Sequence, residues 1–284
     1  MEAARQSTPQ SPIVLTHSEM SSEAYHADTS HYSSSQLAHI LDTPAHFQFH
    51  QAQESTVESD LMRMGTAVHC ALLEPATFPL RYVYAPRAYD LRRNADKAEV
   101  TAILAEHPGR TLISPSEAET LRKVVNGINA HATARALLSG QGDPELSIFW
   151  EDDLTGLPLK VRLDRYTRTG ATGTMVEIKT TDCASAFRFG YKVVDMRYDM
   201  RAAMYVDGVQ KAYGFTPDIV WIVIERDTGF VATYRPSSQM AARGRRLYEQ
   251  SRIALQHALT FDTWPAYQSG ETIETLDLPR KGRS

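Results

Sequence analysis

The segment KVRLDRYTRTGATGTMVEIKTTD, residues 160–182, predicts two paired strands around which the rest of the chain can be arranged. Apolar and polar residues alternate on both sides of the Gly-rich turn TRTGATG, a pattern typical of half-buried strands. Asp164 lies in the first strand. Glu177 and Lys179 lie in the second, where their i, i+2 spacing puts both side chains on one face. If the strands pair through this turn, Asp164 and Glu177 meet on one polar face.

Two carboxylates that share a face repel each other, and removing them from water is costly unless a cation lies between them. Oxygen ligands favour Mg²⁺, for which Mn²⁺ can substitute. A neighbouring lysine can hold a water molecule and offset the charge of a phosphate. Asp164, Glu177 and Lys179 therefore indicate metal-dependent phosphodiester hydrolysis. The alternative is a solvated sheet face with cross-strand ion pairs, which the pattern alone leaves open.

The remaining periodicity predicts a mixed α/β fold. The predicted strands are 145–151, 157–166, 174–181, 218–225 and 230–236. The predicted helices are 36–41, 45–50, 56–75, 116–138, 193–214 and 238–259. Helix 116–138 is expected to open with a capping box, Ser116-x-x-Glu119, and 87–105 is expected to be a loop or a surface helix. This order of elements predicts a central sheet with helices on both faces.

The composition excludes several classes of protein. With a net charge of -4 and a pI near 6.2, the chain cannot hold nucleic acid by bulk positive charge, so a polyanion must bind at a local basic groove. Cys70 and Cys183 are too few for a disulfide framework or an iron–sulfur site, and both are expected to be buried thiols. No membrane span or secretory signal is found, which predicts a cytoplasmic protein. Residues 1–17 are expected to form a disordered arm and 263–284 a carboxy-terminal tail.

Several stretches, in this order, resemble the RecE-like (exonuclease VIII) exonucleases of phages and prophages, within the PD-(D/E)xK nuclease superfamily. They are YSSSQLAHILDTPAHF, RMGTAVHCALLEPATF, PELSIFWEDDLTGLPLKVRLDRY and VEIKTTDCAS. The resemblance covers about residues 18–210. It implies a restriction-endonuclease-like mixed sheet flanked by helices, with an amino-terminal helical segment and an exonuclease domain over 18–262.

Matched position by position, the resemblance implies a catalytic set of His69, Asp164, Glu177 and Lys179. The metal ligands would be His69, Asp164 and Glu177, and Glu145 matches a further acid that would contact the metal. Lys179 would position the attacking water. For His69 the alternative is a core histidine, and Gly65, one turn earlier, predicts a close approach by another backbone.

The implied DNA-binding residues depart from the family in one place. Related nucleases carry a Gln-x-x-x-Tyr pattern, and here Arg201 stands at the Gln position while Tyr205 is retained. Arginine can grip a phosphate bidentately, so Arg201 and Tyr205 are expected to bind substrate. Arg92 and Arg93 are expected to line the DNA entrance.

The resemblance implies a Mg²⁺-dependent exonuclease that degrades linear double-stranded DNA from a 5′ end and leaves 3′ single strands for an annealing protein. It also implies a homo-oligomer, a ring-shaped tetramer or trimer, in the cytoplasm of a bacterial host cell. Two alternatives remain. One is another nuclease of the superfamily that serves repair, although two cysteines cannot supply the four thiolates of an iron–sulfur cluster. The other is a DNA-binding protein with a degenerate site, which Arg201 motivates.

Overall fold

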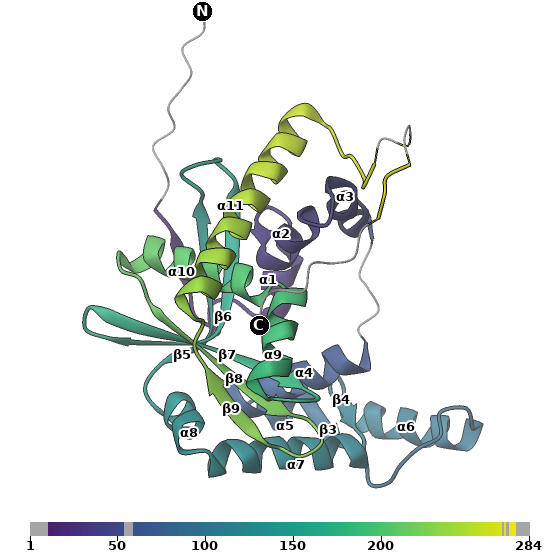
Figure 1. Ribbon diagram of the computed structural model, residues 1–284. Coiled ribbons are helices and arrows are strands. Elements are labelled where there is room, and N and C mark those ends of the chain that lie inside the picture. Colours follow the sequence, from purple (N-terminus) through teal and green to yellow (C-terminus); the bar gives the residue numbers. More distant parts are fainter. Residues whose placement is uncertain (1–10, 54–58, 269, 271–272, 277–284) are drawn as a thin grey trace, which may run out of the picture.

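The central sheet of the protein contains both antiparallel and parallel strands (Figure 1). The structure is a computed structural model that describes residues 11–53, 59–268, 270 and 273–276. Within these residues the strands of the main path run in the order β1-β5-β6-β7-β8-β9. Their bounds are β1 Ile13–Leu15, β5 Asp143–Glu151, β6 Pro158–Thr169, β7 Thr172–Thr181, β8 Asp218–Glu225 and β9 Val231–Tyr234. The predicted meander and the two later strands are therefore confirmed.

Strand direction alternates along this path except at one pair. Neighbouring strands are antiparallel except β7 and β8, which are parallel. Parallel neighbours need a long crossover, and here it consists of α9 (Ala186–Asp195) and α10 (Tyr198–Tyr213). The predicted mixed α/β sheet flanked by helices is confirmed.

The strands β6 and β7 form a fork. One edge of β6 pairs with β5, and the other pairs with β7 only from Arg165, opposite Val176, to the hairpin turn. Toward its beginning, β6 pairs instead with the short strand β2 (Tyr32–Ser33). Asp164 and Glu177 are the next residues after the last paired positions, so they lie where the two strands separate.

Helices cover both faces of the sheet and build two hydrophobic cores. One core packs the sheet against α2 (Ser34–Ile40), α3 (Pro44–Ala52), α9, α10 and α11 (Ser238–Phe261). The other packs it against α4 (Asp60–Leu73), α5 (Phe78–Arg81), α7 (Pro115–Ala130) and α8 (Ala132–Ser139). Val176 and Ile178 of β7 enter the second core, and burying such a side chain fully contributes about 1.5–3 kcal/mol. Glu177 between them therefore points away from that core.

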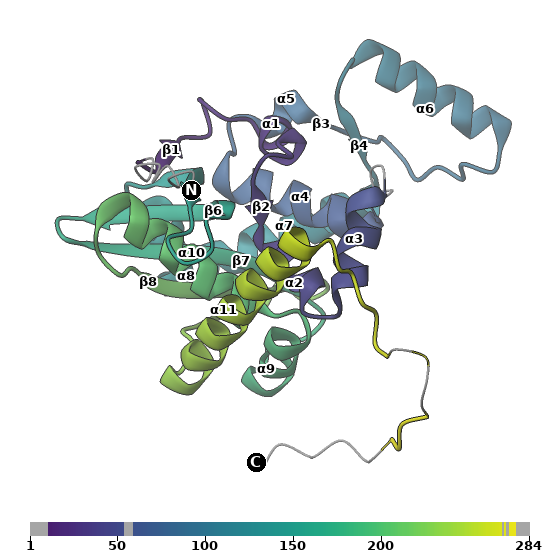
Figure 2. The ribbon, with the colours of Figure 1, turned by 90° about the horizontal axis from the view of Figure 1, so that it is seen from above.

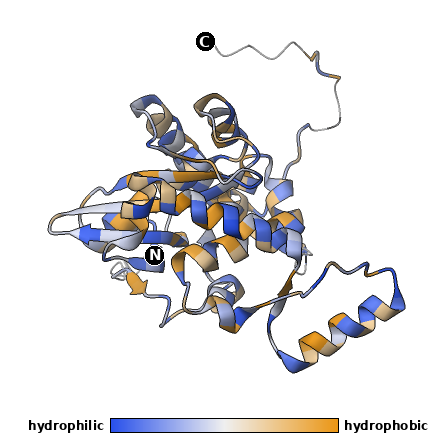
Figure 3. Cartoon of the chain, turned by 90° about the horizontal axis from the view of Figure 1, so that it is seen from below, coloured by the Kyte–Doolittle hydropathy of each residue, from blue (hydrophilic) through white to orange (hydrophobic). Residues whose placement is uncertain are grey.

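A helical arm projects from the body. The helix α6 (Asn94–Glu106) lies between β3 (Tyr82–Tyr84) and β4 (Thr111–Ile113), which pair with each other, and it stands away from the other helices (Figures 2 and 3). The only buried residue of α6 is Asp96, whose carboxylate accepts a hydrogen bond from Asp90 N at 2.8 Å. Of the two predictions for 87–105, the surface helix is the one observed.

The amino-terminal segment is more ordered than expected. Residues 13–15, assigned to a disordered arm, form β1 and pair with Ser147–Phe149 of β5. Three apolar residues in a polar context carry little periodicity, and this strand forms because the edge of β5 offers free backbone partners. Residues 1–10 lie outside the described part of the chain. The helix α1 (Ser22–Ala27) follows β1 and begins at the cap Ser21.

Two of the predicted helices differ from the structure by more than a few residues at their ends. The capping box of α7 is Ser114 with Glu117, not Ser116 with Glu119, because Pro115 is well suited to the first helical position. The predicted helix 116–138 divides at His131 into α7 and α8. The predicted helix 193–214 divides at Arg197, which has a left-handed backbone with φ 53°.

The carboxy-terminal segment begins by packing on the body. Trp264 stacks on Phe47 of α3 with ring centroids 5.7 Å apart, and Pro265 accepts a hydrogen bond from Ala45 N at 3.2 Å. The expected tail therefore starts after these contacts, and residues 277–284 lie outside the described part.

None of the described helices is long and apolar enough to cross a bilayer.

Candidate active site

The two acids of the fork meet, as the strand pattern predicts. The Oδ2 atom of Asp164 accepts a hydrogen bond from Ile178 N at 2.6 Å, and Oε1 of Glu177 accepts one from Asp164 N at 3.4 Å. Because β6 and β7 no longer pair here, their backbone N–H groups need other acceptors. The carboxylates supply them, which holds both acids in fixed positions.

His69 reaches Asp164 from the helix α4. The neighbours of His69 on this helix, Val68 and Cys70, are buried in the second core, while its own ring points out of that core. His69 Nδ1 lies 3.4 Å from Asp164 Oδ1 and 4.0 Å from Glu145 Oε1. His69 is therefore not a core histidine.

Glu145 completes a group of three candidate ligands. One donor atom each of His69, Glu145 and Asp164 lies within 4.8 Å of the other two. Glu145 has a left-handed backbone with φ 51°, and its Oε2 accepts a hydrogen bond from Arg162 Nε at 2.7 Å. Burial, followed by the charge of Asp164, raises the pKa of Glu145 above its ordinary value.

Glu177 lies beside this group rather than within it. Its Oε2 accepts a hydrogen bond from Lys179 Nζ at 2.9 Å, and the same Nζ is 3.8 Å from Asp164 Oδ2. Burial and then the charge of Asp164 raise the pKa of Glu177 to about 7. Burial opposes the charged form of Lys179, but the two carboxylates outweigh it and raise the pKa of Lys179 above its ordinary value. The lysine therefore stays a cation at neutral pH.

The donor set fits a hard divalent cation. Two carboxylates and one imidazole are ligands that Mg²⁺ and Mn²⁺ accept, with water in the remaining positions. Burial and the charge of Asp164 disfavour the charged forms of Glu145 and Glu177, whose pKa values are raised. A cation at His69, Glu145 and Asp164 would favour these charged forms.

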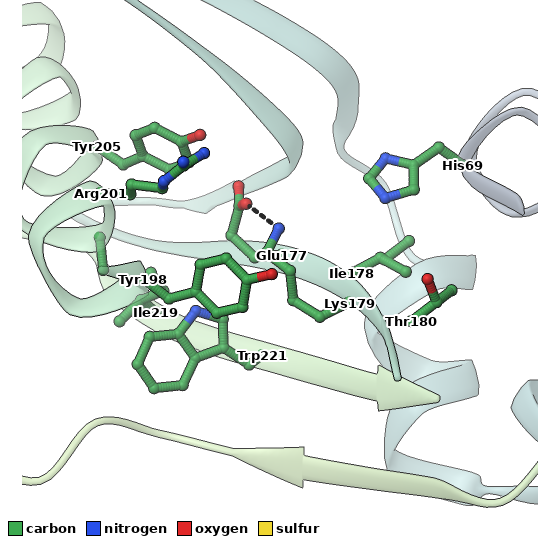
Figure 4. Close-up of a pocket in the computed structure, with 11 residues that line it drawn as sticks. His69, Glu177, Ile178, Lys179, Thr180, Tyr198, Arg201, Tyr205, Ile219 and Trp221 are labelled. Carbon is green, nitrogen blue, oxygen red and sulfur yellow. Dashed lines mark hydrogen bonds and ion pairs between the residues drawn. The ribbon is translucent and has the colours of Figure 1, made fainter. Parts of the chain in front are cut away.

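Two cavities meet at this group. The smaller, of about 220 Å³, contains Lys179, Thr180, Tyr198 and Arg201 in its wall (Figure 4). The larger, of about 840 Å³, is a cleft with the sheet as its floor and with α1, α2, α3 and α4 as its walls. His69 and Tyr205 line both. The candidate site is thus open on two sides.

Gly65 faces the larger cleft. A Cβ atom at this position would meet no atom within 4 Å, so the expected close approach of another backbone to Gly65 is wrong. The residue leaves room in the cleft instead. Cys70 is buried as expected, whereas Cys183 is partly exposed.

Arg201 and Tyr205 line the smaller cavity from α10, and their expected role in substrate binding stays a prediction. Arg201 Nη1 donates to Ser35 Oγ at 3.2 Å, while its buried Nε has no hydrogen-bond partner among the described residues. Burial, followed by the charge of Glu177, raises the pKa of the Tyr205 phenol to about 12. The guanidinium of Arg201 and the amine of Lys179 line the same cavity, and an arginine there can bind an anionic ligand.

Arg92 and Arg93 lie elsewhere. Both are on the arm at the start of α6, and neither lines one of the two cavities described. Arg92 Nε contacts Asp90 Oδ1 at 2.9 Å. The arm therefore places these arginines apart from the ligand group, and their expected role at a DNA entrance stays a prediction.

Two residues of the site, Ser35 and Tyr198, were not predicted from the sequence. Ser35 orients Arg201, and Tyr198 forms part of the cavity wall with its ring 5.6 Å from Lys179 Nζ. Arg162, which donates to Glu145, could have been predicted, because it lies two residues before Asp164 on the same face of β6. Ser35 reaches the site only through tertiary packing.

A family model matches most of the chain. It describes a PDDEXK-like domain of unknown function, DUF3799, and it matches residues 33–278. The chain belongs to this family. As a DUF3799 protein it falls within the PD-(D/E)xK nuclease superfamily, as the sequence resemblance implied, whereas nothing in the match identifies the RecE-like branch.

One solved structure shares the fold of this DUF3799 protein. The crystal structure of a "Putative exonuclease" from Eubacterium rectale matches with a TM-score of 0.58 and 12% identity, and the match covers 92% of this chain and 96% of that one. A second structure, SSO0001, matches with a TM-score of 0.29 and 16% identity over 74% of this chain and 82% of that one. No curated protein matches the DUF3799 chain.

Proposed function

We propose that this protein is a Mg²⁺-dependent exodeoxyribonuclease that degrades linear double-stranded DNA. The observation that carries the proposal is the convergence of His69, Glu145 and Asp164 at the fork of the sheet, with the Glu177–Lys179 pair beside them. Contacts link all five groups: His69 lies near Glu145 and Asp164, and Lys179 lies near Asp164 and Glu177. The exonuclease description of the Eubacterium rectale structure supports the same class of reaction.

The side chains of the site have separable tasks. His69, Glu145 and Asp164 would hold the cation, which polarises a phosphodiester when bound. Lys179 stays protonated and therefore acts as a donor, so it can orient an attacking water or hold a phosphate oxygen. Arg201 lines the smaller cavity, where its guanidinium would contact a neighbouring phosphate.

The finer assignments follow from the RecE-like resemblance. We propose 5′ to 3′ polarity, release of 3′ single strands to an annealing protein during recombination, and assembly as a ring-shaped oligomer in the bacterial cytoplasm. Mn²⁺ is expected to replace Mg²⁺. These assignments depend on the four matching stretches of sequence and are each open to direct measurement.

The decisive experiment compares three DNA substrates: linear duplex, nicked circle and closed circle. The wild-type protein and Lys179→Ala are assayed with Mg²⁺ and with EDTA. We expect the wild type to degrade only the linear duplex and only with Mg²⁺, and Lys179→Ala to lose at least a hundredfold in rate because a charged donor to the reacting phosphate is removed. Lys211→Ala, which removes a lysine paired with Asp153 far from the site, is the matched control.

Other outcomes would change the assignment. Cutting of closed circles would make the protein an endonuclease of the same superfamily. Full activity in Lys179→Ala would remove the lysine from the mechanism. DNA binding without cleavage under any metal condition would support the alternative of a degenerate DNA-binding protein, to which Arg201 at the usual Gln position points.

A further inference from the structure

The helix α9 has apolar side chains on two faces. Phe189 and Val193 pack into the first core. On the outer face Phe187, Tyr191 and Val194 are spaced by four and three residues and remain exposed, with Phe187 at 71% and Tyr191 at 61%. These three residues are termed the α9 stripe. An amphipathic surface helix needs only one apolar face, so the α9 stripe requires a separate explanation.

The chemistry of the α9 stripe is aromatic and cationic. The rings of Phe187 and Tyr191 meet edge to face with centroids 5.1 Å apart. Arg188, between them in sequence, is exposed, and within the described residues its guanidinium makes no hydrogen bond or ion pair. Asp195, near the end of the helix, is the one acid of α9. Exposed rings beside a free cation are the features with which proteins bind single-stranded nucleic acid.

The α9 stripe lies next to one opening of the candidate site. The smaller cavity has Thr180 and Tyr198 in its wall, and these residues precede and follow α9 in the chain. Lys192 of α9 donates to Thr180 O at 3.3 Å, which fixes the helix against this rim. The larger cleft is lined by α1, and Figure 2 shows α1 and α9 on opposite sides of the molecule. A DNA strand that enters through the larger cleft and crosses the site would therefore leave beside α9.

We propose that single-stranded DNA leaving the site stacks its bases on Phe187 and Tyr191 while Arg188 contacts its phosphates. The inference rests on the proposed nuclease function, since it describes the path of that substrate. A second copy of the chain is the weaker choice of occupant. A ten-residue helix is about 15 Å long, and three apolar residues on it fall short of the roughly 800 Å² that each partner buries in a stable interface.

The test measures binding rather than cleavage. A fluorescent single-stranded oligothymidylate of about 20 nucleotides is titrated in EDTA with wild type, Phe187→Ala/Tyr191→Ala and Phe187→Trp/Tyr191→Trp. Loss of two stacked bases is expected to weaken binding at least tenfold in the alanine variant, and the tryptophan variant is expected to bind as the wild type does or more tightly. Phe261→Ala, which removes an equally exposed ring at the end of α11, is the control and should bind normally.

Because the oligonucleotide is bound by the full chain without metal, the assay tests this inference independently of nuclease activity. A protein that cleaves linear duplex but binds the oligonucleotide equally well with and without Phe187 and Tyr191 overturns the inference and leaves the nuclease intact. A wild type that fails to bind the oligonucleotide also overturns it. Sedimentation velocity on the same variants completes the test: an oligomer that dissociates in the alanine variant would show that the α9 stripe joins copies of the chain instead.

Discussion

The carboxylate of Asp164 accepts a hydrogen bond from Ile178 N at 2.6 Å across the gap where β6 and β7 separate. A candidate metal ligand is therefore also a structural link between the two strands. The other oxygen of the same carboxylate faces His69 at 3.4 Å. The two tasks use different oxygen atoms, so they can be separated by substitution.

Asp164→Asn should keep the fold and lose the cation. The amide oxygen can still accept from Ile178 N, but the negative charge is gone. In wild type, Mn²⁺ at about 100 times its Kd should raise Tm by about 5–10 °C, since such binding adds about 2.7 kcal/mol. Differential scanning fluorimetry should show this rise abolished in Asp164→Asn and preserved in Asp153→Asn, a control on an exposed acid. An undiminished rise in Asp164→Asn would place the cation elsewhere.

The metal-free protein should lose stability as the pH rises through the titration of Glu177. The pKa of this buried carboxyl is raised to about 7, so its charged form is disfavoured by folding. The resulting loss in the free energy of unfolding begins near the pKa of Glu177 in the unfolded chain, about 4.5, and is complete above about pH 7. Its magnitude is on the order of 3 kcal/mol. Bound cations favour the charged form and offset the loss.

The measurement compares Tm from pH 5 to 8 in EDTA for wild type and Glu177→Gln. The variant cannot ionise at this position, so the difference between the two proteins should change across that window in favour of the variant. The rise in Tm with Mn²⁺ should be larger at pH 7.5 than at pH 5.5. A difference that is constant with pH would show that Glu177 titrates normally.

Arg201 should act on substrate rather than on stability. Its only side-chain hydrogen bond among the described residues is to Ser35, and its Nε has no partner. Arg201→Ala is expected to raise KM for linear duplex about tenfold and to change the free energy of unfolding by less than about 1 kcal/mol, the size of one hydrogen bond. Arg245→Ala, on a half-exposed arginine of α11, serves as the control. Equal KM values for all three proteins would contradict a role in phosphate binding.

Two glycines in helices should respond oppositely to alanine. A Cβ on Gly127 of α7 would lie 1.9 Å from Gly229 O, so the β8–β9 turn would have to move, at a cost of about 3 kcal/mol. A Cβ on Gly65 of α4 meets nothing within 4 Å, so Gly65→Ala should stabilise the protein by about 0.5–1 kcal/mol through helix propensity. Urea unfolding measures both values, and a destabilising Gly65→Ala would show that α4 packs differently.

The sequence predicts the parts of the fold that depend on local pattern. The hairpin of β6 and β7 follows from alternation and a Gly-rich turn, and the pairing of Asp164 with Glu177 follows from its register. The capping box shows the limit of such patterns. Ser114 with Glu117 and Ser116 with Glu119 fit it equally well, and only the preference of Pro115 for a first helical turn distinguishes them.

Features that depend on tertiary contacts could not be predicted. Arg197 breaks a continuous helical pattern with a left-handed backbone that few residues other than glycine adopt, and its side chain is held there by Ala38 O and Asp42. The strand β1 exists only because β5 presents an edge to it. The arrangement of Ser35 beside Arg201 likewise joins residues 166 positions apart in the chain.

The fork also bears on how relatives of this chain should be judged. Asp164 and Glu177 accept hydrogen bonds from backbone N–H groups that are not paired between β6 and β7. A homologue without cleavage activity would therefore still lose stability if these acids were replaced. The presence of these two acids in a homologue is therefore weak evidence that the homologue is catalytic. The residue to inspect is His69, whose contacts at the fork are with the candidate ligands Asp164 and Glu145.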